Sequence, residues 1–245
     1  MNRILFEKGE IHDGIATFGG VRAQHVLGIL HGEVGQSLRT GEVNGRIGTG
    51  EIVAIGRDAN GDPKVSVRVN HGTESLRPWA DLILAPPRPR VMKRLLPQLA
   101  AIGVGRIVLV GAQKVEKDFW GATLLKEENY RPLLVEGLMQ AGTSIIPELI
   151  VRRAFRRFLN DELDEMFPDS RRVVAHPHGD SDAVNPVKTP SGNRRLLLAI
   201  GPEGGWTDNE VALLEARGFT RYSLGPRILR TETAAIALLA RLEKH

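Results

Sequence analysis

The sequence predicts an α/β protein in two parts, a small β-barrel over residues 1–85 and a larger α/β domain over residues 86–245. Before the proline-rich stretch at 85–90, short runs of β-branched residues alternate with glycines, as in compact β structure. After it, continuous apolar runs alternate with helical patterns, which is typical of a parallel sheet covered by helices on both faces. The stretch itself, APPRPR, removes backbone donors and disfavours helix, so it marks the boundary.

Length and composition are consistent with this division. The chain has 245 residues, of which 42% are hydrophobic and 25% charged, enough for one large domain or two unequal ones. No apolar run approaches the ~20 residues that a membrane span requires, and the first residues lack a signal-peptide pattern, so we expect a cytoplasmic protein. The absence of cysteine excludes disulfides, thiolate metal sites and cysteine nucleophiles.

In the N-terminal part, the dipeptide Asn44-Gly45 separates two strand-like runs, 36–43 and 46–56. This arrangement predicts a β-hairpin with a primed turn, because Asn and Gly both tolerate positive φ. The run VSVRV at 65–69 alternates like a half-buried strand. A short helix is expected over about 19–30.

The C-terminal part predicts five strands and five helices. The strands are expected at 106–112, 148–151, 171–177, 195–201 and 221–225. The helices are expected near 91–102, 122–141, 152–166, 207–217 and 231–243. The fourth helix has clear ends, because Thr207 and Glu210 form a capping-box pattern and Gly218 suits its C-terminus. The polar, turn-rich stretch 176–193 predicts a long surface loop.

Charge gives a modest indication of nucleic acid. Arginine outnumbers lysine 25 to 8, and residues 86–245 carry 24 basic against 19 acidic side chains. Guanidinium groups suit phosphate contacts, although a compositional bias toward arginine explains the count equally well. The candidate RNA contacts lie in basic clusters: Arg88, Arg90 and Arg94, then Arg152, Arg153 and Arg156. For any one of them, a solvated surface is the simpler interpretation.

Several familiar site motifs are absent. The chain has no G-x-G-x-x-G after the first strand of its larger part, no G-x-x-x-x-G-K-[ST] and no G-x-S-x-G, which argues against a dinucleotide fold, a P-loop and an α/β-hydrolase. His176-Pro177-His178 has no further ligands clustered with it, so a plain loop pair is favoured over a metal site.

Two glycine-containing loops follow strands that are consecutive in the sequence. One is GPEGG at 201–205, and the other is LGPRILRTETA at 224–234. Ligands bind at the carboxyl ends of parallel strands, and glycines let the backbone approach a ligand closely. Exposed backbone groups with apolar neighbours suit a purine-containing cofactor, whereas the simpler alternative is a strand–turn–helix with surface ion pairs.

These residues also carry a family resemblance. GPEGG at 201–205, Glu210 in its capped helix and the eleven-residue run at 224–234 resemble the RsmE family of SPOUT-class enzymes. That family methylates uracil N3 in small-subunit (16S) ribosomal RNA. The run RILFEKGEI and the following residues 20–52 resemble the family's N-terminal domain, so the resemblance spans nearly the whole chain.

The resemblance implies a PUA-like RNA-binding barrel followed by a SPOUT domain with a trefoil knot, and assembly as a homodimer. It also implies S-adenosylmethionine (SAM) as cofactor, with no metal. The implied cofactor-binding residues are His176, Ile200, Gly201, Glu203, Gly205, Leu224, Gly225, Ile228, Leu229, Arg230 and Thr231.

Methylation of uracil N3 requires stabilisation of an anion and removal of one proton. We expect Arg230 to stabilise the charge and Glu232 to act as base or to orient the arginine. Alternatively, Glu232 only complements the positive end of its helix. Departures from the family pattern at Gln98, Ala101, Met139 and Thr143 leave two further hypotheses open. One is a methyltransferase acting on another RNA nucleotide, and the other is a non-catalytic RNA-binding protein of ribosome assembly.

Overall fold

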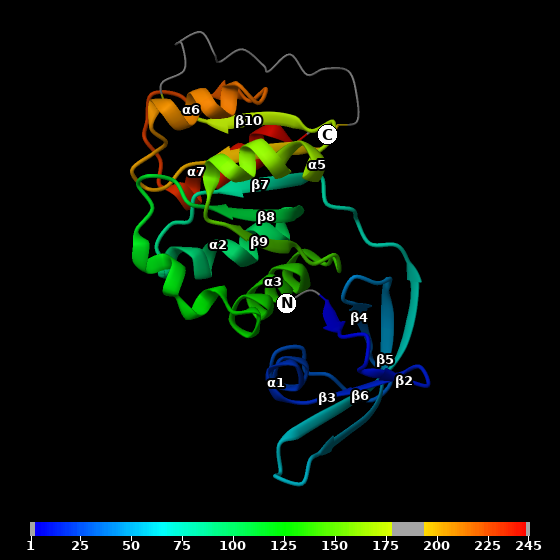
Figure 1. The fold of residues 1–245 in the computed structure, drawn as a ribbon. Helices are drawn as coiled ribbons and strands as arrows, with labels where there is room; N and C mark the ends of the chain where they lie inside the picture. The colour runs from blue at the N-terminus through cyan, green and yellow to red at the C-terminus, as the bar shows by residue number, and fades with distance from the viewer. Residues whose placement is uncertain (1–2, 178–193, 244–245) are drawn as a thin grey trace. The chain divides into compact units, whose positions relative to one another are not determined.

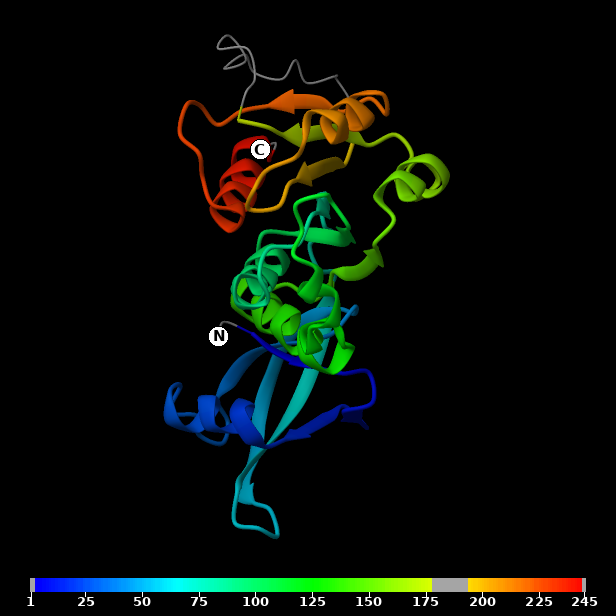
Figure 2. The same cartoon turned by 60° about the vertical axis from the view of Figure 1, so that its left-hand side comes forward.

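The computed structural model describes residues 3–177 and 194–243, which form two compact units (Figures 1 and 2). The first unit gathers the chain up to Arg77 together with Leu134–Ile146, and the second gathers Pro78–Leu133 and the chain from Pro147 onward. Of the surface loop predicted at 176–193, residues 178–193 lie outside the described residues.

The first unit is built on a six-stranded sheet in the order β1-β4-β5-β6-β3-β2. Its elements are β1 (Ile4–Phe6), β2 (Ile11–His12), β3 (Ile15–Phe18), α1 (Gly20–Gly28), β4 (Ser37–Glu42), β5 (Ile47–Arg57) and β6 (Pro63–Thr73). The pairing of β1 with β4 is parallel and the other four pairings are antiparallel. The β-rich character predicted for this part and its short helix are confirmed.

The predicted hairpin of β4 and β5 forms, but its turn differs from the predicted one. Asn44 has a positive φ of 59°, whereas Gly45 is not in the left-handed region, so the turn is not of the primed type with both residues at positive φ. Asn44 instead serves a longer-range contact. Its N–H donates to the Ser144 carbonyl at 2.8 Å, and its Oδ1 accepts from the Ile146 N–H at 3.0 Å. This bonding to residues 144–146 sets the turn's conformation.

The second unit is built on a six-stranded sheet in which every pairing is parallel. Its strands are β7 (Ala80–Leu84), β8 (Val104–Val110), β9 (Glu148–Arg152), β10 (Arg171–Ala175), β11 (Leu196–Ile200) and β12 (Thr220–Tyr222). They lie in the order β12-β10-β11-β7-β8-β9. The parallel sheet predicted from the apolar runs is confirmed.

Strand β7 moves the domain boundary. The predicted division at residue 85 leaves this strand in the N-terminal part, yet β7 pairs with β11 and β8 at the centre of the second sheet. All five of its residues are buried, which fits a central strand. The proline-rich stretch 85–90 is therefore the connection from β7 into the next helix, and the second unit begins at Pro78.

The helices of the second unit follow the predicted rhythm with small shifts. They are α2 (Pro89–Ala101), α3 (Glu127–Ala141), α4 (Phe155–Arg157), α5 (Leu163–Met166), α6 (Asp208–Glu215) and α7 (Thr231–Leu242). A π-helical turn, Phe158–Glu162, joins α4 to α5. Helix α3 begins five residues later than predicted, because the 3₁₀ turns Lys117–Gly121 and Thr123–Leu125 precede it. The last residues of α3, from Leu134, group with the first unit.

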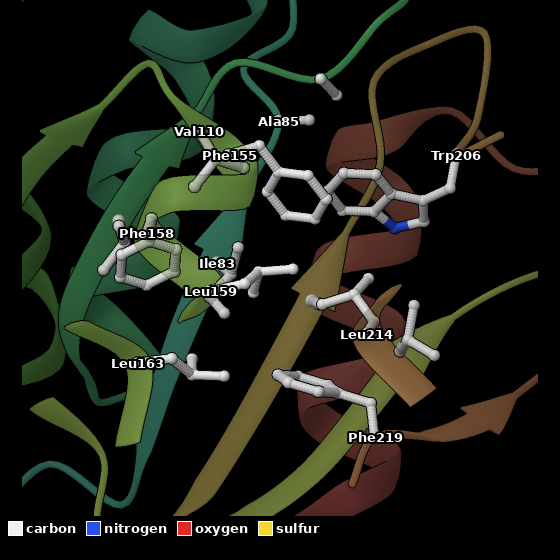
Figure 3. Close-up of a cluster of buried hydrophobic side chains, with 14 of the residues drawn as sticks. Ile83, Ala85, Val110, Phe155, Phe158, Leu159, Leu163, Trp206, Leu214 and Phe219 are labelled. Atoms are coloured by element: carbon white, nitrogen blue, oxygen red, sulfur yellow. The ribbon is translucent and has the colours of Figure 1, made fainter. Parts of the chain in front are cut away.

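Helices cover both faces of the parallel sheet, because alternate side chains of each strand point to opposite faces. On one face, α7 packs against β11 and α2, and α2 packs against β8. On the other face, aromatic and aliphatic side chains of α4–α6 cover the strands (Figure 3). Ile83 and Val110 of the sheet are fully buried there, together with Leu163 and Leu214.

The parallel arrangement brings the carboxyl ends of all six strands to one edge of the sheet, where ligands bind in open α/β folds. The loops of interest, after β8, β11 and β12, all leave from this edge. Within the described residues, no helix is both long and apolar enough to cross a membrane. Residues 3–177 and 194–243 also contain no group of three or more histidine or acidic side chains that could hold a metal ion.

Candidate active site

A pocket of about 560 Å³ opens at the carboxyl ends of β10, β11 and β12. Its size is within the range of small-molecule and cofactor sites. One wall is the loop after β11, from Ile200 to Trp206, and the facing wall is the segment Tyr222–Gly225 with Arg227–Leu229. Ile200 and Leu238, both 2% exposed, give the pocket an apolar floor.

The loop after β11 is held closely to its neighbours. At Gly201, an added Cβ would lie 2.9 Å from the Trp206 backbone nitrogen, so only glycine fits there. The Gly205 N–H donates to the Pro202 carbonyl at 2.8 Å and closes the turn. Lys114, in the loop after β8, donates from Nζ to the Gly204 carbonyl at 2.8 Å. The backbone of this pocket wall is therefore fixed before any ligand binds.

The predicted capping box at the start of α6 forms and does more than cap the helix. The Glu210 carboxylate accepts from the Thr207 N–H at 2.8 Å and the Thr207 hydroxyl at 2.9 Å. Its other oxygen accepts from the Gln113 N–H at 2.7 Å. Because it bonds to Gln113 and to Thr207, this single carboxylate ties the loop after β8 to the loop after β11. Glu210 is only 7% exposed.

The loop after β12 is more open. Gly225 has a φ of 108°, a conformation that a side chain would strain, and its N–H donates to the Ser223 hydroxyl at 3.2 Å. The apolar residues that follow are solvent-exposed, with Leu224 at 39% and Ile228 at 83%. This wall of the pocket therefore presents unburied hydrophobic surface.

The structure brings ten of the eleven predicted cofactor residues to the pocket wall. They are His176, Ile200, Gly201, Glu203, Gly205, Leu224, Gly225, Ile228, Leu229 and Thr231. His176 is 8% exposed, and its N–H donates to the Tyr222 carbonyl at 3.2 Å, which links the ends of β10 and β12. The family resemblance implied these residues, and strand-end position independently pointed to the two glycine loops that hold most of them.

Arg230 and Glu232 lie outside this wall. Arg230 is an exposed residue at the N-cap of α7, where its carbonyl accepts from the Ala234 N–H. Glu232, in the first turn of α7, pairs with Arg94 at 3.7 Å. The cations that line the pocket are Lys114 and Arg227. Lys114, in the loop after β8, stands where the family resemblance places an arginine, and it was expected to face substrate or a partner chain and not the cofactor.

Comparison with known proteins agrees with this site. Residues 74–243 match the model of the RNA methyltransferase domain family. The chain is 32% identical over 251 residues to "Ribosomal RNA small subunit methyltransferase E" of Treponema pallidum, covering 98% of this chain and 90% of that protein. A protein of the same name from Synechocystis is 56% identical over 139 residues, covering 54% of this chain and 45% of the relative. The chain belongs to the RsmE family.

Solved structures agree with this membership of the RsmE family. A Legionella pneumophila methyltransferase structure in complex with bound SAM matches with a TM-score of 0.73 and 26% identity, covering 98% of this chain and 96% of that one. A ribosomal RNA small subunit methyltransferase E from Neisseria gonorrhoeae, bound to S-adenosyl methionine, matches with a TM-score of 0.74 and 19% identity. It covers 99% of this chain and 96% of that one, and it supports the fold.

The six arginines predicted to contact RNA divide by their partners in this RsmE-family chain. Three pair with carboxylates: Arg88 with Glu116, Arg94 with Glu232 and Arg152 with Glu162. Arg153 lies over the Trp120 ring, 5.3 Å from its centroid. Arg90 and Arg156 are exposed, and within the described residues neither has an ion-pair partner. These two are the most available for a bound polyanion.

Proposed function

We propose that this chain is a SAM-dependent methyltransferase that modifies uracil N3 of a uridine in small-subunit (16S) ribosomal RNA. The observation that carries the proposal is the pocket at the carboxyl edge of the second sheet, where the two loops of the family motif meet. The names of the relatives and the SAM-bound Legionella structure support the same function.

The residues of the pocket fit such a cofactor. Backbone groups of Gly201 and Gly225 stand at the wall, and the apolar floor suits an adenine ring. Glu203 and Asp208 also line the pocket and offer carboxylates to hydroxyl and ammonium groups. The space that Gly201 leaves is taken by the Trp206 backbone, so the cradle is already shaped.

The chemistry needs little beyond orientation and charge. Bound SAM supplies an activated methyl group, whose bond to sulfur breaks with return of the electron pair to sulfur as the bond to N3 forms. The protein must hold donor and acceptor in line and favour transfer of the N3 proton to a water molecule. Lys114 and Arg227, the cations of the pocket wall, are placed to stabilise the resulting negative charge on uracil. We assign that role to them in preference to Arg230, and Glu232 orients Arg94.

The remaining parts of the proposal concern architecture and assembly. We propose that the first unit is a PUA-like RNA-binding barrel, that the second carries the trefoil knot of SPOUT proteins, and that the enzyme works in the cytoplasm as a homodimer. The exposed apolar residue Leu224 supports a partner surface beside the pocket. Sedimentation equilibrium of the whole chain tests the dimer, since a monomer at micromolar concentration would contradict it.

The function is tested by titration calorimetry with SAM and by incubation with unmodified small-subunit ribosomal RNA. We expect saturable SAM binding, and nucleoside analysis by mass spectrometry should detect 3-methyluridine in the RNA. A methyl group on another nucleotide would favour the alternative specificity. Absence of SAM binding, backed by absence of thermal stabilisation at high SAM concentration, would favour a non-catalytic RNA-binding protein.

A further inference from the structure

A second hollow, of about 520 Å³, opens at the same edge of the parallel sheet, beyond the ends of β8 and β9. The turn into α4 forms one side of it, and the first residues of α6 form the other. Its residues all belong to the second unit. The candidate cofactor pocket uses the ends of β10–β12, so the two hollows divide the carboxyl edge between them.

The two hollows share an aromatic wall. Phe155 lines the second hollow and Trp206 lines the cofactor pocket. Their rings are stacked, with centroids 5.4 Å apart and planes inclined by 20° (Figure 3). Both side chains are at least nine-tenths buried, so the wall is fixed. A ligand in the second hollow would therefore be separated from the cofactor pocket by the stacked rings of Phe155 and Trp206.

The lining of the second hollow combines amide and guanidinium groups. Gln113 and Asn209 contribute carboxamides from its two sides, and carboxamides hydrogen-bond to the edges of nucleobases. Arg156 and Arg157 contribute positive charge. Arg157 pairs with Asp161 at 3.6 Å, whereas Arg156 has no ion-pair partner among the described residues. This set of groups suits a nucleotide, with its base edge and its phosphate.

Among the described residues that line the second hollow, the one carboxylate, Glu210, is already engaged. Both oxygens of Glu210 accept hydrogen bonds, from the Gln113 N–H and from Thr207, so they face the protein's own donors. The same bonds fix the backbone of Gln113 relative to the start of α6. Glu210 thus holds the two carboxamide-bearing segments in place on either side of the hollow.

We propose that the second hollow binds a nucleotide adjacent to the target uridine in the RNA, with its phosphate at Arg156 and its base edge against Gln113 and Asn209. The proposal rests on the proposed function, because a methyltransferase must hold its acceptor RNA beside its cofactor. A single-stranded or unstacked RNA fits best, since its base edges are free to meet the amides.

The test measures binding of a short, fluorescently labelled single-stranded RNA containing a uridine, by anisotropy at several salt concentrations. Arg156→Ala is expected to raise the RNA Kd about fivefold to tenfold and to lower the slope of log Kd against log salt by about 0.7, as loss of one phosphate contact would. Asn209→Ala and Gln113→Ala are expected to raise the Kd severalfold without changing the salt slope.

Arg241→Ala is the matched control, because Arg241 is an exposed arginine in the last turn of α7, away from the carboxyl edge. Its RNA Kd should stay within twofold of the unmodified protein. SAM affinity is measured for every variant and should be unchanged, which separates loss of a contact from loss of the fold.

The proposal is overturned if Arg156→Ala and Asn209→Ala bind RNA like the unmodified protein, or if Arg241→Ala weakens binding equally. It is also overturned if the variants lose SAM and RNA affinity together. Failure of the proposed function gives a different result, because the unmodified protein would then bind no SAM or leave the RNA unmethylated. The RNA affinities of the variants would still show whether the second hollow binds RNA.

Discussion

Arginines that differ in their partners lie at the two edges of the parallel sheet. At the amino edge, three arginines bind other parts of the fold: Arg106 donates to the Met166 carbonyl, Arg171 to the Leu242 carbonyl and Arg195 to the Asp81 carboxylate. At the carboxyl edge, Arg156, Arg227 and Arg230 are exposed, and within the described part of the chain their guanidinium groups have no hydrogen-bond or ion-pair partner.

This difference bears on the arginine-rich composition. Arginines of both kinds occur at the carboxyl edge, where Arg152 and Arg157 pair with carboxylates. The three unpaired guanidinium groups there lie where ligands bind in parallel sheets. We therefore expect the three bound arginines of the amino edge to serve stability and the three unpaired ones of the carboxyl edge to serve binding. Four predictions test this separation.

The largest effect is expected at the carboxyl edge, from Gly201→Val. The new Cβ would meet the Trp206 backbone nitrogen at 2.9 Å, so the loop after β11 must shift out of the pocket wall. We expect SAM affinity measured by calorimetry to fall about tenfold to a hundredfold. Gly121→Val is the control, because an added Cβ at Gly121 meets nothing within 4 Å. Equal SAM affinity in both variants would contradict the assigned pocket.

The second prediction concerns Asp81, a buried carboxyl group at the amino edge, and the pH dependence of the free energy of unfolding. Burial raises the pKa of Asp81 to about 6, although Arg195 opposes the shift. The folded chain therefore holds a proton that the unfolded chain has lost, and this contribution to the free energy of unfolding falls as pH rises from about 4 to about 6. The difference between a pKa of about 6 in the folded chain and the ordinary value of 3.8 corresponds to about 3 kcal/mol.

Asp81→Asn isolates this contribution from the other carboxylates, some of which act in the opposite direction. Arg172 and Arg217, for example, lower the pKa of Asp164. Subtracting the variant's urea-unfolding free energies from those of the unmodified protein should leave a curve that declines between pH 4 and 6. Asp118→Asn, at an exposed carboxylate, is the control. A flat difference curve for Asp81→Asn would be evidence against the buried acid.

The next prediction compares the effect of removing an arginine at each edge on the stability of the fold. Arg172 donates to the Arg217 carbonyl at 2.8 Å and pairs with Asp164 at 2.7 Å, so Arg172→Ala should cost about 2 kcal/mol. Thermal unfolding should then occur about 4–8 °C lower. Arg230→Ala, at the opposite edge, should leave the unfolding temperature unchanged. Equal destabilisation by both would remove the distinction between the edges.

The sequence predicted those parts of the second unit that depend on local pattern. The apolar runs gave the parallel sheet, and Thr207 and Glu210 gave the start of α6, because each signal lies within a few residues. Strand-end position pointed to the two glycine loops, since all parallel strands end at the same edge, and the family resemblance supplied the ten cofactor residues that lie on the pocket wall. Arg230 was expected on the same wall but does not line it, because the direction of its side chain depends on how α7 begins.

What sequence could not supply are pairings across long separations. β7 precedes a proline-rich stretch, so it was assigned to the first part, yet its partners β8 and β11 lie later in the chain. Asn44 adopts its conformation through residues 144 and 146, about a hundred positions away. The bond from Gln113 to Glu210, which organises the second hollow, joins equally distant segments.

The smallest effect on stability is expected at Ile228, which lines the cofactor pocket although its side chain is 83% exposed. Ile228→Ser should change the unfolding free energy by less than about 0.5 kcal/mol, because an exposed side chain contributes little to the folded state. SAM affinity should nevertheless fall about threefold to tenfold, since part of the apolar area that a ligand would cover is lost.

Val21→Ser provides the control, because Val21 is a comparably exposed aliphatic residue, at 75%, on α1 in the first unit. It should change neither stability nor SAM affinity. If Ile228→Ser destabilised the chain while leaving SAM affinity intact, the open loop after β12 would be a structural element like the amino edge. If Ile228→Ser instead weakened SAM binding and left stability unchanged, ligand binding and not folding would be what buries this hydrophobic surface.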